Sequence, residues 1–192
     1  MVISERIRDK VYLTAAKHYG TSLSVIRFLA AQNESFLDIS SFKEDKYWSR
    51  FASSLSSSKK PPKIWAADYV NHAPVNKQVL RIISDLRSKG YVLAALSNAI
   101  PPRLSLNRKR KLYDIFDSTT FSCEPGVDCK KPNSKIYRIC LQRLNLPPEE
   151  CIFIDDRKEN LAAAKKLGLG TIHFKSASHL KKELKKILPG KS

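Results

Sequence analysis

The sequence predicts an α/β protein built around a parallel sheet. From about residue 74 onward, short apolar runs with the character of strands alternate with amphipathic segments of helical period. Such alternation is typical of βαβ units, in which the strands run parallel and the connecting helices cover the sheet. Polar residues follow three of the apolar runs. Because open parallel sheets bind ligands at the carboxyl ends of their strands, we expect a functional site there.

The first part of the chain shows a purely helical pattern. Apolar residues recur at helical spacing within residues 7–19, 25–29 and 47–55, as they do on amphipathic helices. A stretch rich in serine, lysine and proline, residues 53–62, then predicts a connector. We therefore expect a small helical domain over residues 5–70 and an α/β domain over residues 71–192.

Four strands and four helices are predicted in the second part. The strands cover residues 91–96, 118–121, 151–154 and 171–174, and the first is expected to be buried. The helical faces cover residues 79–86, 136–144 and 161–167, and Ser178 is expected to open a last helix. Gly90 and Gly168 each follow a helical face, at the place where a left-handed residue commonly ends a helix.

The composition fits a globular protein with one good core. The 192 residues are 42% hydrophobic, and no apolar run approaches the roughly 18 residues that span a bilayer. The first residues lack the apolar block of a secretory signal, so we expect a cytoplasmic protein with no membrane partner. The four cysteines lie far apart without the spacing of a zinc site, and we expect free thiols in the core.

The formal net charge of +17 is large and is spread over both halves of the chain. A field of this sign attracts phosphorylated small molecules or nucleic acid. The densest basic cluster, residues 107–111, has no aromatic residues interleaved with it, although nucleic-acid surfaces commonly use them. A basic nucleic-acid-binding module is therefore the least favoured of the functions considered.

The polar residues that follow the strands are suited to phosphoryl transfer. Ser97 and Asn98 end the first strand, and their hydroxyl and amide can donate to phosphoryl oxygens. Lys131 follows the second strand across a loop and can neutralise phosphate charge. Asp155 and Asp156 end the third strand, where adjacent carboxylates repel one another unless a cation lies near them. Magnesium needs only one or two carboxylates besides a phosphate.

Each of these groups also has a simpler explanation when taken alone. Ser97 and Asn98 can form a turn and a helix cap, Lys131 can be a solvated loop residue, and the two aspartates can cap the next helix. The order of the three groups, each at the end of a strand, favours a magnesium-dependent phosphoryl-transfer site.

Residues 74–188 resemble the haloacid dehalogenase-like (HAD) hydrolase superfamily, in its branch with a helical cap. The resemblance is carried by the residues that follow the strands and by their surroundings: Ser97-Asn98, Lys131-Pro132 with Ile136-Tyr137, and Cys151-Ile152-Phe153-Ile154-Asp155-Asp156 with Asn160. It implies a Rossmann-like core beneath a cap, and a phosphatase of a small phosphorylated metabolite that works through an aspartyl-phosphate. It also implies roles for five side chains. Ser97 binds the phosphoryl group with Asn98 beside it, Lys131 holds nucleophile and phosphate together, and Asp155 ligates Mg²⁺ with Asp156 in or near the outer sphere of the ion.

The chain departs from the family pattern in two places. The loop before Lys131 has about two extra residues, so Lys130 is an alternative for the active lysine. The Asp-x-Asp motif of the family's first strand, which supplies the nucleophile, is missing. We expect that this central strand lies upstream of Met1 in the working protein. The alternative is an inactive relative that binds phosphate. The substrate and the oligomeric state stay open.

Overall fold

A computed structural model describes residues 5–34, 42–64 and 75–188 of the chain. The chain divides into two compact units, of which the first takes in the residues up to 74 with Asn98–Leu112 and Ser122–Asp128. The second unit comprises Val75–Ser97, Tyr113–Phe121 and Cys129–Ser192. The predicted domain limits, residues 5–70 and 71–192, stay a prediction.

The first unit is helical and has an aromatic core. Its helices are α1 (Glu5–Tyr19), α2 (Leu23–Gln32), α3 (Glu44–Ser54) and α6 (Pro101–Lys109). The rings of Tyr47, Trp48 and Phe51 on α3 pack with centroids 4.9–5.0 Å apart. The hydroxyl of Tyr19 donates to the Trp48 carbonyl oxygen at 2.8 Å, so α1 is tied to α3 inside this core. Burial raises the pKa of Tyr19 to about 12.

The second unit contains the strands. They are β1 (Ala94–Ser97), β2 (Ser118–Phe121), β3 (Ile152–Asp155) and β4 (Gly170–His173). Parallel pairing joins β1 to β2 and β3 to β4, in two separate two-stranded sheets. The helices are α5 (Lys77–Ser88), α7 (Ser134–Leu144), α8 (Lys158–Lys166) and α9 (Ala177–Ile187), with a 3₁₀ turn η2 (Pro148–Glu150) before β3. The predicted α/β class with parallel strands is confirmed.

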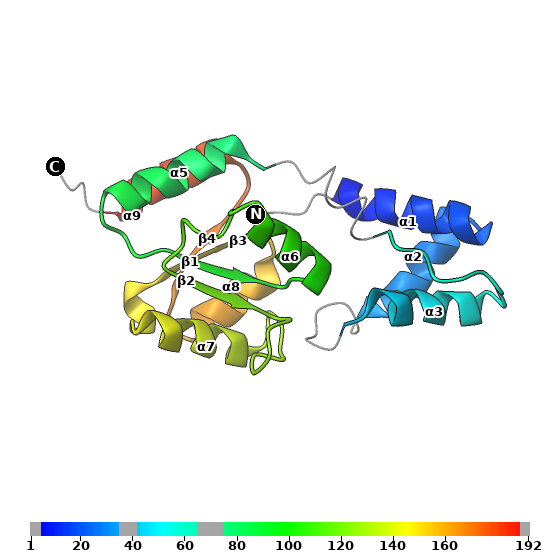
Figure 1. The fold of residues 1–192 in the computed structure, drawn as a ribbon. Helices are drawn as coiled ribbons and strands as arrows, with labels where there is room; N and C mark the ends of the chain where they lie inside the picture. Colours follow the sequence, from blue (N-terminus) through cyan, green and yellow to red (C-terminus); the bar gives the residue numbers. More distant parts are fainter. Residues whose placement is uncertain (1–4, 35–41, 65–74, 189–192) are drawn as a thin grey trace. The chain divides into compact units, whose positions relative to one another are not determined.

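Helices cover both faces of the strands, with α5 and α9 on one side and α7 and α8 on the other (Figure 1). Successive residues of β3 point to opposite faces. Ile152 and Ile154 pack with the core around Leu180 and Leu184 of α9. Phe153 and Asp155 meet side chains on the α7 and α8 side. Because its side chains alternate between the two faces, β3 has one apolar face that packs on α9 and one face on which Asp155 reaches the polar site.

Some predicted boundaries were wrong by a few residues. The strand predicted over residues 91–96 is β1, which begins only at Ala94 and is half-buried instead of buried. A strand that pairs along one edge leaves its other edge open, which explains the partial exposure. The last helix is capped by Ser176, whose Oγ accepts the N–H of His179, and not by Ser178. Gly90 and Gly168 have φ of +76° and +92°, as expected after helix ends.

All four cysteines are free thiols. Cys123 and Cys140 are buried as predicted, whereas Cys129 and Cys151 are only half-buried, so the prediction that all four lie in the core was wrong for these two. Burial raises the pKa of the Cys140 thiol, so this group stays protonated and apolar in character. Within the described part of the chain, no helix combines the length and the apolar character needed to cross a membrane.

The first unit offers a matched test of its aromatic core. Phe51 is fully buried, whereas Phe28 on α2 is 64% exposed. We expect Phe51→Ala to lower the free energy of unfolding by about 3–5 kcal/mol, because it removes buried contacts and leaves a cavity. Phe28→Ala should change it by less than about 0.5 kcal/mol. Urea denaturation of both variants measures the difference, and equal effects would contradict the described core.

Candidate functional site at the ends of β1 and β3

A buried ion pair joins Lys131 to Asp155. Lys131 lies in the loop before α7, and Asp155 is the last residue of β3. The lysine Nζ lies 2.7 Å from Asp155 Oδ2, and the two side chains are only 10% and 6% exposed. The same Nζ donates to the carbonyl oxygen of Leu96 at 3.1 Å. Since Leu96 precedes Ser97 in β1, one ammonium group links the carboxyl ends of β1 and β3.

The second oxygen of Asp155 is held by the start of α8. Asp155 Oδ1 accepts the backbone N–H of Arg157 and the side-chain amide of Asn160, each at 2.9 Å. Burial alone would raise the pKa of the Asp155 carboxyl, but Lys131 and these hydrogen bonds outweigh burial, so the pKa lies below its ordinary value. Asp155 is therefore an ionised carboxylate with a fixed orientation.

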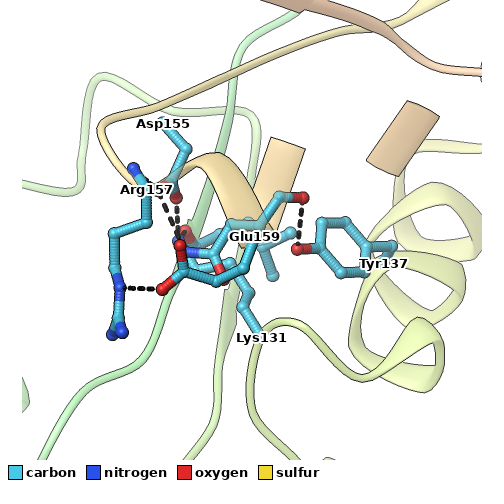
Figure 2. A network of polar contacts seen from close by, with 7 residues as sticks. Lys131, Tyr137, Asp155, Arg157 and Glu159 are labelled. Atoms are coloured by element: carbon cyan, nitrogen blue, oxygen red, sulfur yellow. Dashed lines mark hydrogen bonds and ion pairs between the residues drawn. The ribbon is translucent and has the colours of Figure 1, made fainter. Parts of the chain in front are cut away.

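A layer of aromatic residues lies behind the ion pair. The Lys131 Nζ lies 5.3 Å from the centroid of the Phe153 ring, within the range of a cation–π contact. The ring of Tyr137 packs edge-on against Phe153 with centroids 5.3 Å apart. The Tyr137 hydroxyl donates to the backbone carbonyl oxygen of Asn160 at 2.9 Å. Figure 2 shows the hydrogen bonds and ion pairs that connect this network.

Ser97 and Asn98 lie where the sequence predicts, at the end of β1. Ser97 is the last residue of the strand and is half-buried. Asn98 begins the segment that belongs to the first unit. The next residue, Ala99, is held by the buried Ser122, whose Oγ accepts the Ala99 N–H at 3.0 Å and donates to the Ala99 carbonyl oxygen at 3.3 Å. This pair of bonds fixes the backbone just after Asn98.

The remaining two candidates differ in their surroundings. Asp156 is exposed, and its carbonyl oxygen accepts a hydrogen bond from His173 Nε2 at 3.0 Å. Lys130 is half-buried, and its carbonyl oxygen accepts the N–H of Asn133. Of the two adjacent lysines, Lys131 makes the ion pair with Asp155. Across residues 5–34, 42–64 and 75–188, no cluster of three or more His, Cys, Asp or Glu side chains is suited to hold a metal.

Tyr137, Phe153 and Asn160 belong to the family pattern of the sequence, but the sequence assigns no role to any of them. A signal for Asn160 exists in its position, because a polar residue on the buried side of a helix needs a hydrogen-bond partner. Asn160 is 3% exposed. Tyr137 and Phe153 carry no such signal, since aromatic residues at helix and strand positions are usual in a core.

A sequence model of the family "haloacid dehalogenase-like hydrolase" matches residues 41–168. Among curated proteins, the chain is 40% identical over 111 residues to acyl-CoA dehydrogenase family member 10 of Mus musculus, covering 55% of this chain and 10% of that protein. It is 34% identical over 100 residues to the phosphorylated carbohydrates phosphatase of Thermotoga maritima, covering 51% of this chain and 45% of that protein. The chain thus spans less than half the length of each of these relatives.

Solved structures share the fold. A HAD family enzyme of Bacteroides thetaiotaomicron superposes with a TM-score of 0.73 at 20% identity, over 94% of this chain and 92% of that one. A variant of that enzyme in complex with magnesium and inorganic phosphate has a TM-score of 0.69 at 21% identity, over 89% and 90%. A predicted HAD-like family hydrolase of Porphyromonas gingivalis also has a TM-score of 0.69, at 22% identity over 93% of this chain and 91% of that one.

The ion pair leads to a pH-dependent prediction. Lys131→Met leaves the Asp155 carboxylate buried without its cation, and we expect a loss of about 3 kcal/mol in the free energy of unfolding at pH 7. The native pair stabilises the fold above the unfolded-state pKa of Asp155, and this contribution is lost as the pH falls through the lower folded-state pKa. Without Lys131 the pKa of Asp155 lies above its value in the parent, because burial then meets less opposition. The difference in stability between parent and variant should therefore shrink steadily as the pH falls from 7 toward 3, because the variant protonates the carboxyl at a higher pH than the parent does.

Lys130→Met is the matched control, since it removes the same charge one residue away. Its effect on urea unfolding should be less than about 1 kcal/mol and nearly independent of pH. If both variants lost the same free energy of unfolding, independently of pH, that result would contradict the described ion pair.

Proposed function

This chain belongs to the haloacid dehalogenase-like hydrolases, and from that membership we propose that it works as a magnesium-dependent phosphatase of a small phosphorylated metabolite. The observation that carries the proposal is the Lys131–Asp155 pair at the carboxyl ends of β1 and β3, at 2.7 Å. Two relatives give further support by their names: the phosphorylated carbohydrates phosphatase and the enzyme in complex with magnesium and inorganic phosphate.

The residues of β1 and the lysine loop bind the phosphoryl group in this proposal. Ser97 donates its hydroxyl, and Asn98 its amide, to phosphoryl oxygens. Lys131 supplies the positive charge, because its ammonium already lies at the junction of the two strand ends, 3.1 Å from the Leu96 carbonyl oxygen. Its contact with Asp155 favours Lys131 over Lys130 as the active lysine.

The two carboxylates fit a magnesium ion in different ways. Asp155 Oδ1 already accepts two hydrogen bonds and Oδ2 accepts one from Lys131, so Asp155 offers at most one further lone-pair direction. Asp156 is exposed and is the carboxylate better placed to ligate a cation. One or two carboxylates with phosphate oxygens suffice for Mg²⁺. The ion would neutralise phosphoryl charge when bound.

We further propose that a strand outside the described residues lies between β1 and β3 and brings the aspartate nucleophile. The described strands form two separate parallel pairs, and β1 and β3 do not pair with each other. Lys131 nevertheless contacts both of them. Open strand edges are normally covered or paired in a native fold. A strand in this place would complete one sheet and end beside Lys131.

The helical residues 5–70 act as a cap in this proposal and choose the substrate. We also propose a cytoplasmic location, supported by four free thiols in a chain with no disulfide. An inactive, phosphate-binding relative is the second candidate. It is favoured by one observation: within the described part of the chain, no third carboxylate joins Asp155 and Asp156.

Activity measurements separate the two candidates. We compare residues 1–192 with a version extended upstream in its natural reading frame, using an aryl phosphate with and without Mg²⁺. Only the extended form should hydrolyse the ester, and only with Mg²⁺. Asp156→Asn should lower its kcat/KM by at least about 100-fold, which is about 2.7 kcal/mol. Lys130→Ala, made in the same form, should change it by less than about threefold.

Equal hydrolysis by residues 1–192 alone would refute the proposed external nucleophile. Phosphate binding without hydrolysis in both forms would favour the inactive relative.

Hydrogen exchange tests the proposed strand without any activity. In the extended form, amides of Ala94–Ser97 and Ile152–Asp155 should exchange at least about tenfold more slowly than in residues 1–192. Amides of β2 and β4, which lie away from the proposed strand, serve as the control. Unchanged exchange in β1 and β3 would show that no strand lies between them.

A further inference from the structure

Tyr137 connects the two segments that carry the ion pair. It lies in the first turn of α7, six residues after Lys131, and is 1% exposed. Its hydroxyl donates to the carbonyl oxygen of Asn160, in the first turn of α8. Burial and the negative charges of Asp155 and Glu159 raise the pKa of Tyr137, so the hydroxyl keeps its proton and stays a donor. The α7 segment is thereby fixed to the α8 segment beside the site.

A single residue, Asn160, links the Tyr137 hydroxyl to Asp155 by two hydrogen bonds. The backbone carbonyl oxygen of Asn160 accepts a hydrogen bond from the Tyr137 hydroxyl. The side-chain amide of Asn160 donates to Asp155 Oδ1 at 2.9 Å. With this amide and the Arg157 N–H in place, Oδ1 is held toward α8 and Oδ2 toward Lys131. If Asn160 shifts, Oδ1 loses one of its two donors and the carboxylate can rotate.

A second path runs through the Tyr137 ring. The ring packs edge-on against Phe153 at 5.3 Å, and the Phe153 ring lies 5.3 Å from Lys131 Nζ. Tyr137 therefore contacts the Phe153 ring, which lies beside Lys131. It also contacts Asn160, whose amide lies beside the Asp155 carboxylate. In Figure 2 the tyrosine lies on the α7 side of the network, and its hydroxyl points toward the residues around Asp155.

We propose that Tyr137 is a positioning residue for the Lys131–Asp155 pair. Its hydroxyl keeps Asn160 where the amide can orient Asp155, and Asp155 in turn orients the ammonium that meets the phosphoryl group. The inference rests on the proposed phosphatase function, which assigns this ammonium to the phosphoryl group. Tyr137 itself touches no reacting atom in this scheme.

Tyr137→Phe isolates the hydroxyl, because the ring and its contact with Phe153 are kept. Tyr19→Phe is the matched control: Tyr19 is also a buried tyrosine, and its hydroxyl donates to the backbone carbonyl oxygen of Trp48 in the helical unit. Both variants lose one buried hydroxyl-to-carbonyl bond. Their urea midpoints should fall by similar amounts.

Two readouts then distinguish positioning from stability. In ¹⁵N-labelled residues 1–192, the side-chain amide protons of Asn160 should exchange at least about tenfold faster in Tyr137→Phe than in the parent, and at the parent rate in Tyr19→Phe. In the form that hydrolyses the aryl phosphate, Tyr137→Phe should lower kcat about tenfold with KM changed less than about twofold.

Unchanged Asn160 exchange in Tyr137→Phe would overturn the proposal, as would an unchanged kcat of Tyr137→Phe. If no form of the chain hydrolyses a phosphate ester, the proposed function fails. The exchange of the Asn160 amide then decides by itself whether Tyr137 positions Asp155.

Discussion

The ion pair between Lys131 and Asp155 is the interaction on which the site depends. Two charges this well buried are stable only when each is matched by its partner and by further hydrogen bonds. Asp155 has those bonds from Arg157 and Asn160, and Lys131 has the Leu96 carbonyl oxygen. The pair therefore fixes three elements at once: the end of β1, the loop before α7 and the start of α8. Removing any one of these contacts loosens the others.

The division of the strands into two pairs gives this ion pair a structural role as well. Within the described residues, β1–β2 and β3–β4 share no backbone hydrogen bonds. Helices bridge the pairs, since α7 packs on β1 and β2 and contacts α8, which packs on β3 and β4. The lysine is a direct link between β1 and β3 at their carboxyl ends. This charge holds the carboxyl ends of β1 and β3 close to each other.

The large positive charge does not by itself identify a partner. Exposed lysines on α9 are solvated, and one of them pairs with Glu183. Such surface pairs contribute little to stability. The ammonium of Lys131 differs from these surface charges, because its side chain is only 10% exposed and pairs with a buried carboxylate. Its low exposure concentrates the field at the strand ends, where screening by water is weak. The remaining charge can attract anionic ligands over a distance, and is screened by salt.

The sequence by itself determined the α/β class, the parallel strands and the order of the polar residues that follow them. These features depend on local periodicity and on residue type, which a single chain displays directly. It also placed Lys131 and Asp155 among the candidates. It could not show that the two meet, nor choose between Lys130 and Lys131, because a contact across 24 residues depends on how α7 packs against α8.

Only the tertiary structure decided what Asn160, Tyr137 and Phe153 contact. Tyr137 and Phe153 are ordinary residues of an amphipathic helix and an apolar strand, and they meet each other across 16 positions of the sequence. Asn160 is a polar residue on a buried helix face, but its sequence position alone does not name Asp155 as its partner. The same holds for the exposure of β1: an apolar run predicts a strand, whereas the pairing of its edges sets how deeply it is buried. Local sequence fixes which groups are available, and packing fixes which of them meet.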